Sequence, residues 1–203
     1  MALLENSKGI RSTYYFRSVK STFKPDIIKT IGSLGHEIGY HYENLSYCKG
    51  QEHLAMEDFK NKLGKYKELI PINTISMHGS PLSKYNNKAL WEKEENHKLL
   101  NKLGILGEVY LDIDYRDIAY IGDTGRTWLR TGSNIRDYVN SNIRIQINNF
   151  YELLEAFRSK KYSKVCFQVH PERWSDNIFD YNIQHIKDLS VNIIKKFILL
   201  VRS

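Results

Sequence analysis

Short apolar runs alternate with amphipathic stretches along the whole chain. β-branched and aromatic runs predict strands, and apolar residues three or four positions apart predict helices. Residues 13–16 form such a strand, and a helix opened by Pro25 leads directly into a second strand that ends at His41. A strand, a helix and a strand within so short a stretch are typical of a βαβ unit with parallel strands. The pattern therefore predicts an α/β fold, built as one domain over residues 1–203.

The rest of the chain repeats this alternation. Helical spacing predicts further helices at residues 2–8, from Leu54 to Tyr66, from Leu90, from Asn148 or Asn149 to about Ser159, and from Ile183 to Leu200. The last of these helices is expected to close the domain with its apolar face. Strands are predicted to end at Met77, Gly122 and Val169, and two alternating segments, 108–114 and 142–147, are also predicted to be strands.

Four of the predicted strands lead into an ionisable residue where the chain turns into a loop. These residues are His41, His78, Asp123 and His170. Because parallel strands bring their carboxyl ends to one rim, and functional groups of β/α barrels collect there, we expect the four side chains at one opening. His36, which begins its strand, is expected to serve the structure instead.

Asp112 and Asp114 would share one face of the strand predicted over 108–114. Two neighbouring carboxylates on one face can bind a cation. The other interpretation, which we favour, is a solvated strand face.

The segment from Thr124 to Arg136 is loop-like and contains Arg126, Trp128 and Arg130. An indole ring beside guanidinium groups suits sugar stacking and anion contacts. The same residues are equally compatible with a packed loop.

Composition narrows the class of protein only moderately. With 41% hydrophobic and 26% charged residues the chain is typical of a globular protein, and a net charge of +7 suits an acidic partner. Lysine and arginine are spread along the sequence, so we expect a solvated basic surface and no nucleic-acid partner. Two cysteines build no disulfide framework, and neither a signal peptide nor a membrane-length apolar run is found. These features predict a cytoplasmic protein without a membrane partner.

The segment Gly35–His41 resembles the second motif of the polysaccharide deacetylases, carbohydrate esterase family four or the chitooligosaccharide deacetylase homology group. Four other segments resemble a less studied branch of the same superfamily, namely Ser12–Phe16, Met77–Pro81, Asp123–Arg126 and His170–Trp174. The resemblance implies a distorted (β/α) barrel of the glycoside hydrolase and deacetylase type. It also implies a hydrolase of non-peptide carbon–nitrogen bonds that removes acetyl groups from an N-acetylated carbohydrate.

In that family a divalent metal, usually zinc, polarises the amide carbonyl and binds the attacking water, and an aspartate deprotonates the water. By resemblance, His170 is the general acid that protonates the leaving amine, and Asp123 and Arg126 orient the acid and the substrate. His41 matches a metal ligand. The family's next histidine ligand falls on Leu45 here, so His78 is our proposed replacement.

The family's first motif, a strand with an aspartate pair, should precede residues 13–16 by one helix, and the chain begins inside that helix. We therefore expect an N-terminally shortened domain without the first barrel strand. Zinc binding should then be weak or absent, and Glu43, close to His41 in sequence, is a poor substitute for the missing base. The strand at 13–16 would also keep an unpaired edge, a site for self-association.

Two functions of different classes follow from these matches and departures. The first is a metal-dependent deacetylase, impaired in the shortened chain. The alternative is a non-catalytic glycan-binding or assembly module derived from the same fold.

Overall fold

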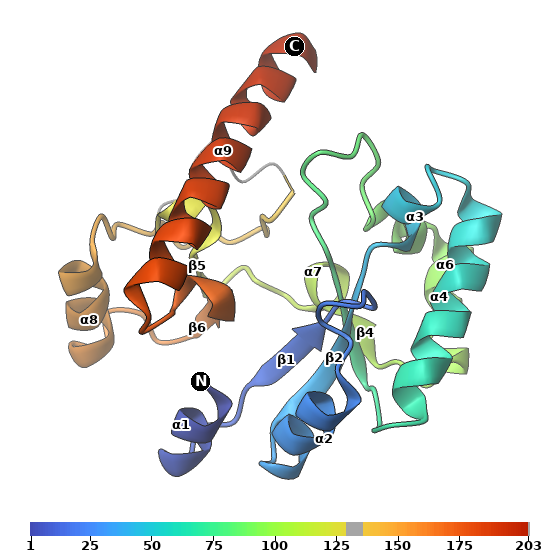
Figure 1. Cartoon of the computed structure of the whole chain (residues 1–203), viewed down its shortest axis with the longest axis horizontal. Helices are drawn as coiled ribbons and strands as arrows, with labels where there is room; N and C mark the ends of the chain where they lie inside the picture. The colour runs from blue at the N-terminus through green and yellow to red at the C-terminus, as the bar shows by residue number, and fades with distance from the viewer. Residues whose placement is uncertain (129–135, 203) are drawn as a thin grey trace. The chain divides into compact units, whose positions relative to one another are not determined.

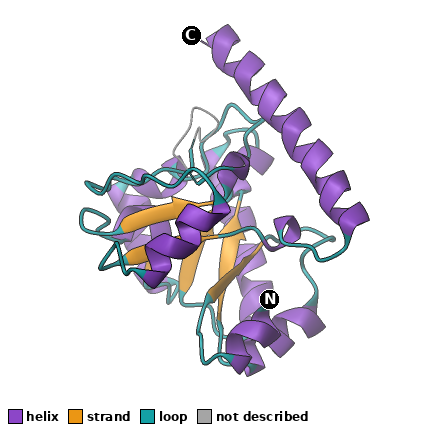
Figure 2. Ribbon diagram, turned by 90° about the vertical axis from the view of Figure 1, so that its left-hand side faces the viewer, coloured by secondary structure: helices purple, strands orange, loops and turns teal. Residues whose placement is uncertain are grey.

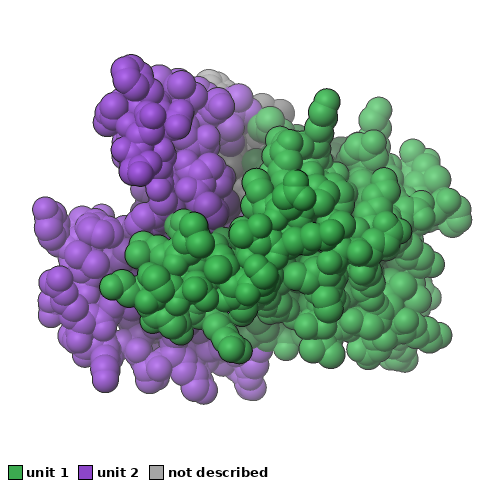
Figure 3. Space-filling model, turned by 60° about the horizontal axis from the view of Figure 1, so that its bottom comes forward, with its two compact units in different colours: residues 1–113 green, residues 114–203 purple. Residues whose placement is uncertain are grey.

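The computed structural model describes residues 1–128 and 136–202, without the side chains of residues 195–202. The chain divides into two compact units, Met1–Ile113 and Asp114–Ser203, which Figure 3 colours separately. Both units contain parallel strands and helices, so the predicted α/β class is confirmed. Within the described part of the chain, no helix combines the length and apolar character needed to cross a membrane. The prediction of a single domain stays a prediction.

Unit 1 is a four-stranded parallel sheet with helices between its strands (Figure 1). Its elements are α1 (Ala2–Ser7), β1 (Thr13–Phe16), α2 (Pro25–Ser33), β2 (Glu37–Tyr42), α3 (Asn44–Tyr47), α4 (Glu52–Lys67), β3 (Thr74–Met77), α5 (Ala89–Glu92), α6 (Glu94–Lys102), β4 (Gly107–Glu108) and α7 (Val109–Asp112). The strand order is β1-β2-β3-β4, so β1 is an edge strand of this sheet. Self-association through that edge stays a prediction.

Local sequence explains the βαβ unit at the start of unit 1. Pro25 occupies the first turn of α2, where its missing N–H costs nothing. Gly35, at a φ of +86°, reverses the chain between α2 and β2. Gly39 in the middle of β2 lets the ring of Tyr15 cross the sheet, because a Cβ at Gly39 would lie 2.2 Å from Cε1 of that ring.

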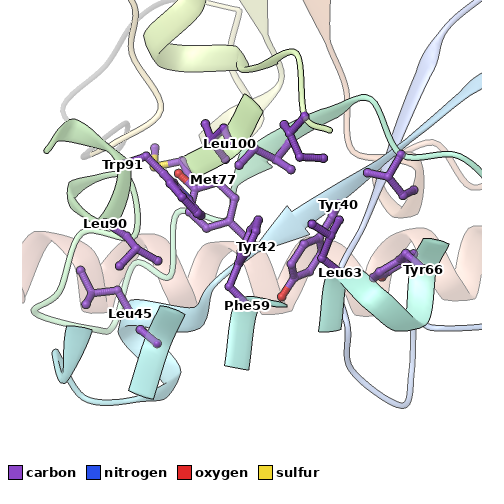
Figure 4. Close-up of a cluster of buried hydrophobic side chains, with 14 of the residues drawn as sticks. Tyr40, Tyr42, Leu45, Phe59, Leu63, Tyr66, Met77, Leu90, Trp91 and Leu100 are labelled. Carbon is purple, nitrogen blue, oxygen red and sulfur yellow. The ribbon is translucent and has the colours of Figure 1, made fainter. Parts of the chain in front are cut away.

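An aromatic core fills one face of this sheet (Figure 4). Tyr40 and Tyr42 of β2 point to it, and Phe59 of α4 lies 5.3 Å and 5.9 Å from their ring centroids. The Trp91 ring of α5 lies 4.6 Å from Phe59. Burying one such side chain stabilises the fold by about 1.5–3 kcal/mol. Because strand side chains alternate, this burial holds His41 on the opposite face of β2, as the sequence pattern predicts.

Unit 2 is built on two parallel strands, β5 (Ala119–Gly122) and β6 (Val165–Gln168). The long helix that ends at the C-terminus in Figure 2 belongs to the same unit. Its helices are α8 (Phe150–Arg158) and α9 (Ile178–Arg202), and two 3₁₀ turns follow the strands, η1 (Thr124–Arg126) and η2 (Pro171–Arg173). The side chain of Asn149 caps α8 by accepting a hydrogen bond from the Glu152 N–H at 2.9 Å. A small core of Ile121, Ile147, Leu153 and Ala156 joins α8 to the sheet.

The strand predicted over 108–114 is wrong. Only β4 is extended there, and the chain then turns into α7, because the Glu108 side chain caps that helix and the Asp112 carboxylate accepts a hydrogen bond from the Glu108 N–H at 2.6 Å. Burial raises the pKa of Glu108 to about 7. Asp114 instead pairs with Arg116 at 2.6 Å. The two aspartates therefore do not share a strand face, and neither of the interpretations based on such a face applies.

The strand predicted over 142–147 is also wrong. Residues 142–147 form a loop, and the Ser141 hydroxyl donates a hydrogen bond to the Ile118 carbonyl at 2.7 Å at its start. The alternation that suggested a strand has a different origin: Ile147 is buried in the core of unit 2, whereas Ile143 stays exposed.

The C-terminal helix is confirmed as α9, but its expected burial is wrong. Ile183, Ile186, Leu189 and Ile193 are 48–63% exposed. The contacts of α9 with the two 3₁₀ turns come from its other side, through Asp188 and Tyr181. Phe197 and Leu200, which belong to the predicted apolar face, have side chains outside the described set.

Candidate functional site

The structure brings the predicted strand-end residues together in two pairs. His41 lies beside His78 in unit 1, and Asp123 lies against His170 in unit 2. Arg126 also belongs to unit 2. A common opening for both pairs stays a prediction. Within each pair, distances and hydrogen bonds define the arrangement of the side chains.

Two neighbouring parallel strands position the histidine pair. His41 lies opposite Ser76 in the register of β2 and β3, and the His78 N–H extends that ladder by donating to the Tyr42 carbonyl at 2.7 Å. The two imidazole rings are 5.2 Å apart between centroids and nearly perpendicular, at 84°. Adjacent strand ends therefore place both rings on the face of the sheet opposite the aromatic core.

Hydrogen bonds fix which nitrogen of each ring carries the proton. The Nδ1 atom of His41 lies 2.9 Å from the Ser76 carbonyl oxygen, which can only accept, so Nδ1 donates and Nε2 carries the lone pair. The Nδ1 atom of His78 lies 3.0 Å from Oε2 of Glu43, which assigns the same tautomer. Both rings thus offer Nε2, the lone-pair nitrogen that binds metals in carboxylate–histidine–metal arrangements.

Arg17 and Glu43 hold His78 in this state. The Arg17 guanidinium donates to both Glu43 oxygens, at 2.8 Å to Oε2 and 2.9 Å to Oε1. Burial raises the pKa of the Glu43 carboxyl, but the hydrogen bonds and charges of His78 and Arg17 outweigh burial and lower it to about 2. A carboxylate with so low a pKa is a weak base, and the contacts of Glu43 are those of a residue that orients His78.

The loop after β3 is held by a fully buried amide. Asn87 donates to the His78 carbonyl at 2.7 Å and to the Ser80 hydroxyl at 3.1 Å, and its oxygen accepts from the Ser46 N–H at 2.8 Å. The Ser80 backbone has a φ of +41°, a left-handed conformation that non-glycine residues adopt only when their surroundings impose it. Asn87 therefore fixes the backbone from which His78 projects.

Replacing Asn87 with alanine is expected to destabilise unit 1 by about 1–3 kcal/mol, because it leaves a buried N–H and a buried carbonyl without partners. Urea titration followed by hydrogen exchange of the β2 and β3 amides measures this cost. The matched control is Asn86→Ala, which removes a neighbouring, partly exposed amide that accepts from the Lys88 N–H. Equal effects of the two substitutions would contradict the role assigned to Asn87.

The histidine pair fits zinc, because both imidazoles are suitable donors and the Ser76 carbonyl and the Glu43 carboxylate orient them. Catalytic zinc keeps three protein ligands, and His41 and His78 supply two nitrogens. Among residues 1–128 and 136–202, no group of three His, Cys, Asp or Glu side chains is placed to hold a metal. The pair by itself should therefore bind a divalent transition metal weakly.

The second pair lies where β5 and β6 end side by side. The His170 Nδ1 atom is 2.5 Å from Oδ1 of Asp123, and the His170 N–H donates to the other carboxylate oxygen at 2.9 Å. The Arg173 Nη1 atom, which can only donate, lies 2.8 Å from the same nitrogen, but the contact to the carboxylate oxygen is the shorter one and two acceptors would repel at 2.5 Å, so we assign the proton to Nδ1. The His170 side chain is 33% exposed and that of Asp123 only 7%, so a buried carboxylate orients an accessible imidazole.

Two residues of the same turn complete the surroundings of Asp123. Arg173 donates to Oδ1 at 2.8 Å, and the Trp174 indole N–H donates to Oδ2 at 3.1 Å. Burial raises the pKa of Asp123, but hydrogen bonds and charges from His170 and Arg173 outweigh it and hold that pKa below its usual value. Asp123 is therefore ionised at neutral pH, and it orients the His170 ring through Nδ1.

Arg126, expected beside the acid, makes its ion pair elsewhere. Its Nε donates to Asp188 of α9 at 2.8 Å, and its guanidinium lies over the ring of Tyr181. Arg173 is the arginine that contacts both Asp123 and His170. Sequence reasoning gave Arg173 no role, although its position three residues after His170, in a turn opened by Pro171, places both side chains on one side.

Three further residues were singled out from the sequence, namely His36, Trp128 and Arg130. His36 accepts from the Ser12 N–H at 3.2 Å and contacts the Ala2 carbonyl at 3.0 Å, so its predicted structural role is confirmed. Trp128 packs against Trp174, at 5.9 Å between ring centroids. Arg130 lies outside the described residues.

Comparisons with protein-family models, characterised proteins and solved structures found no match to this chain. The geometry of the two pairs therefore carries the functional argument.

Proposed function

We propose that this chain is a polysaccharide deacetylase-like hydrolase that removes N-acetyl groups from a carbohydrate with the help of a divalent metal, most simply zinc. The observation that carries the proposal is the Asp123–His170 pair, in which a buried carboxylate orients an accessible imidazole. The histidine pair of unit 1 supports it. We propose the (β/α)-barrel type with it, which the parallel strands and intervening helices of each unit support.

Unit 1 would hold the metal. His41 and His78 bind it through Nε2, and Glu43, fixed by Arg17, keeps the proton of His78 on Nδ1. When bound, the metal supplies polarisation of the amide carbonyl and acidification of a water molecule.

Unit 2 would supply the proton for the leaving amine. Because Asp123 holds the Nδ1–H of His170, Nε2 is the nitrogen that carries the transferable proton. Asp123 and Arg173 keep the ring in one orientation, which holds Nε2 in place for proton transfer to the leaving amine. His170 is the catalytic residue, and Asp123 is a positioning residue.

The incomplete ligand set favours a second candidate, a glycan-binding module without turnover. Two imidazoles without a third ligand in the described residues bind metal weakly, and Glu43 is too acidic to serve as the base. This candidate predicts sugar binding that is independent of metal and no release of acetate.

Metal binding tests the role of the histidine pair. Replacing His78 with alanine is expected to abolish zinc binding, because one of the two imidazole ligands is lost. Glu43→Gln is expected to weaken zinc binding about 10- to 100-fold, because the carboxylate that orients His78 is lost. Calorimetric zinc titration, run alongside acetate release from N-acetylglucosamine oligomers, measures both. The control is His53→Ala, which removes an exposed histidine of α4.

Unchanged zinc affinity in His41→Ala and His78→Ala would exclude the histidine pair as the metal site. Zinc binding by the wild-type chain without acetate release would support the glycan-binding candidate.

A further inference from the structure

Unit 2 contains a pocket whose lining includes neither Asp123 nor His170. Its volume is about 440 Å³, within the range of small-molecule sites. Its lining includes three aromatic residues, Tyr120, Trp128 and Tyr138, and three polar ones, Asp137, Asn142 and Arg144. Aromatic faces combined with a carboxylate, an amide and a guanidinium match the alternating apolar and hydroxylated faces of a sugar ring.

The pocket adjoins the Asp123–His170 pair through three connections. Gly122 lines it and directly precedes Asp123. Asp137 accepts a hydrogen bond from the Thr124 hydroxyl at 2.5 Å, one residue after Asp123. The Trp128 ring lies 5.9 Å from the Trp174 ring at an angle of 46°, and the Trp174 indole N–H donates to Asp123. The pocket wall therefore continues directly into the segment that carries Asp123.

Polar groups at the back of the pocket are fixed in place. The Tyr120 hydroxyl donates to Asp137 at 2.5 Å and also contacts the Gln168 amide oxygen. Asp137 thus accepts hydrogen bonds from both Tyr120 and Thr124, which hold its carboxylate in one orientation. Such a pre-organised wall loses little entropy when a ligand binds.

Two exposed side chains on the loop after Ser141 differ from this fixed wall. Asn142 and Arg144 line the pocket, and neither side chain makes a hydrogen bond or an ion pair in the described structure. By contrast, Arg126 and Arg173 of the same unit both pair with Asp188. Arg144 is therefore a cation available to a ligand anion, and Asn142 an amide available to a ligand hydroxyl.

We propose that this pocket binds a sugar residue that carries an acidic group, with the ring on Trp128, a hydroxyl on Asn142 and the carboxylate on Arg144. The inference rests on the proposed function for the choice of a carbohydrate, and it deepens that function by naming an anionic saccharide as the substrate class. The net charge of +7 favours the same class.

A matched pair of ligands tests the proposal: methyl glucuronide and methyl glucoside, which differ in one carboxylate. Binding is measured by NMR titration with the whole chain, without metal, so that turnover plays no part. The wild type is expected to bind the glucuronide about tenfold more tightly, because a charge-assisted hydrogen bond to Arg144 is added. In Arg144→Ala the two affinities should become equal, with glucoside binding unchanged.

Three further variants separate this result from general charge or folding effects. Arg158→Ala removes an exposed arginine of α8 outside the pocket and should keep the tenfold preference. Asn142→Ala should weaken both glycosides by a similar factor. Trp128→Ala should do so more strongly, and Asn142→Ala keeps the test decisive if loss of the indole unfolds the unit.

A wild type that binds both glycosides equally, or neither, would overturn the proposal, as would a preference that survives in Arg144→Ala. The same measurements distinguish failure of the proposed deacetylase function from failure of the proposed sugar site. Glucuronide preference without any acetate release would support the anionic sugar site and contradict the deacetylase function. Acetate release without such a preference would contradict the anionic sugar site alone.

Discussion

Replacing His170 with alanine is expected to lower acetate release from N-acetylated oligosaccharides by about 100- to 10,000-fold, while the bound zinc stays unchanged. The range is that of general acid catalysis by a positioned side chain. His170 belongs to unit 2, where its Nδ1–H donates to Asp123. The histidine pair that would hold the metal belongs to unit 1. Turnover and metal content should therefore respond independently. Steady-state acetate release and calorimetric zinc titration measure the two quantities.

Two variants control this experiment. His53→Ala removes an exposed histidine and should leave acetate release unchanged. Asp123→Asn keeps the shape of the side chain but removes the negative charge beside Nδ1 of His170, so it should change the pH profile of the reaction. Simultaneous loss of zinc and turnover in His170→Ala would contradict the acid role, and full activity would exclude it.

Local patterns in the sequence predicted much of the fold. Alternation in β2 correctly separated the buried face, with Tyr40 and Tyr42, from the face of His41. Pro25 and Gly35 bracketed α2, and Asn149 marked the start of α8. These signals are reliable because they depend on backbone preferences and burial within a few residues.

Predictions failed where polar side chains bind the backbone or distant residues. Glu108 and Asp112 fold the end of a predicted strand into α7 by capping it, which alternation does not reveal. The partners of the site were missed for a related reason. Arg17 reaches Glu43 across the sheet, and Arg173 reaches Asp123 across the two strand ends. Only the tertiary structure brings such residues together.

Both units contain the same arrangement of a carboxylate and a histidine. In each, a buried or half-buried carboxylate is fixed by an arginine and binds the Nδ1–H of a histidine, which directs Nε2 outward: Glu43 with His78, and Asp123 with His170. The arrangement serves metal binding and proton transfer equally well, because both need one defined tautomer. The roles that we propose for them therefore rest on their neighbours, which are a second imidazole in unit 1 and a pocket lined by Gly122 in unit 2.

Replacing Asp123 with alanine is expected to destabilise unit 2 by about 3–5 kcal/mol at neutral pH. It removes the carboxylate closest to Arg173, which keeps only Asp188 at 3.2 Å as an ion-pair partner, and it removes the acceptor of two further N–H groups. These groups are the His170 N–H and the Trp174 indole. Asp123→Asn keeps an acceptor and should cost less. Urea titration with hydrogen exchange of the β5 and β6 amides reports on unit 2 separately.

The difference between wild type and Asp123→Ala should depend on pH with a definite sign. The pKa of Asp123 is lower in the folded chain than in the unfolded one, so its stabilisation is fully present above the unfolded value of about 3.9. It is lost as the pH falls through the folded value. Acid titration of both proteins should therefore show their free energies of unfolding converging below about pH 4. A difference that stays constant down to acid pH would mean that packing around Asp123, and not its charge, holds Arg173 and His170 in place.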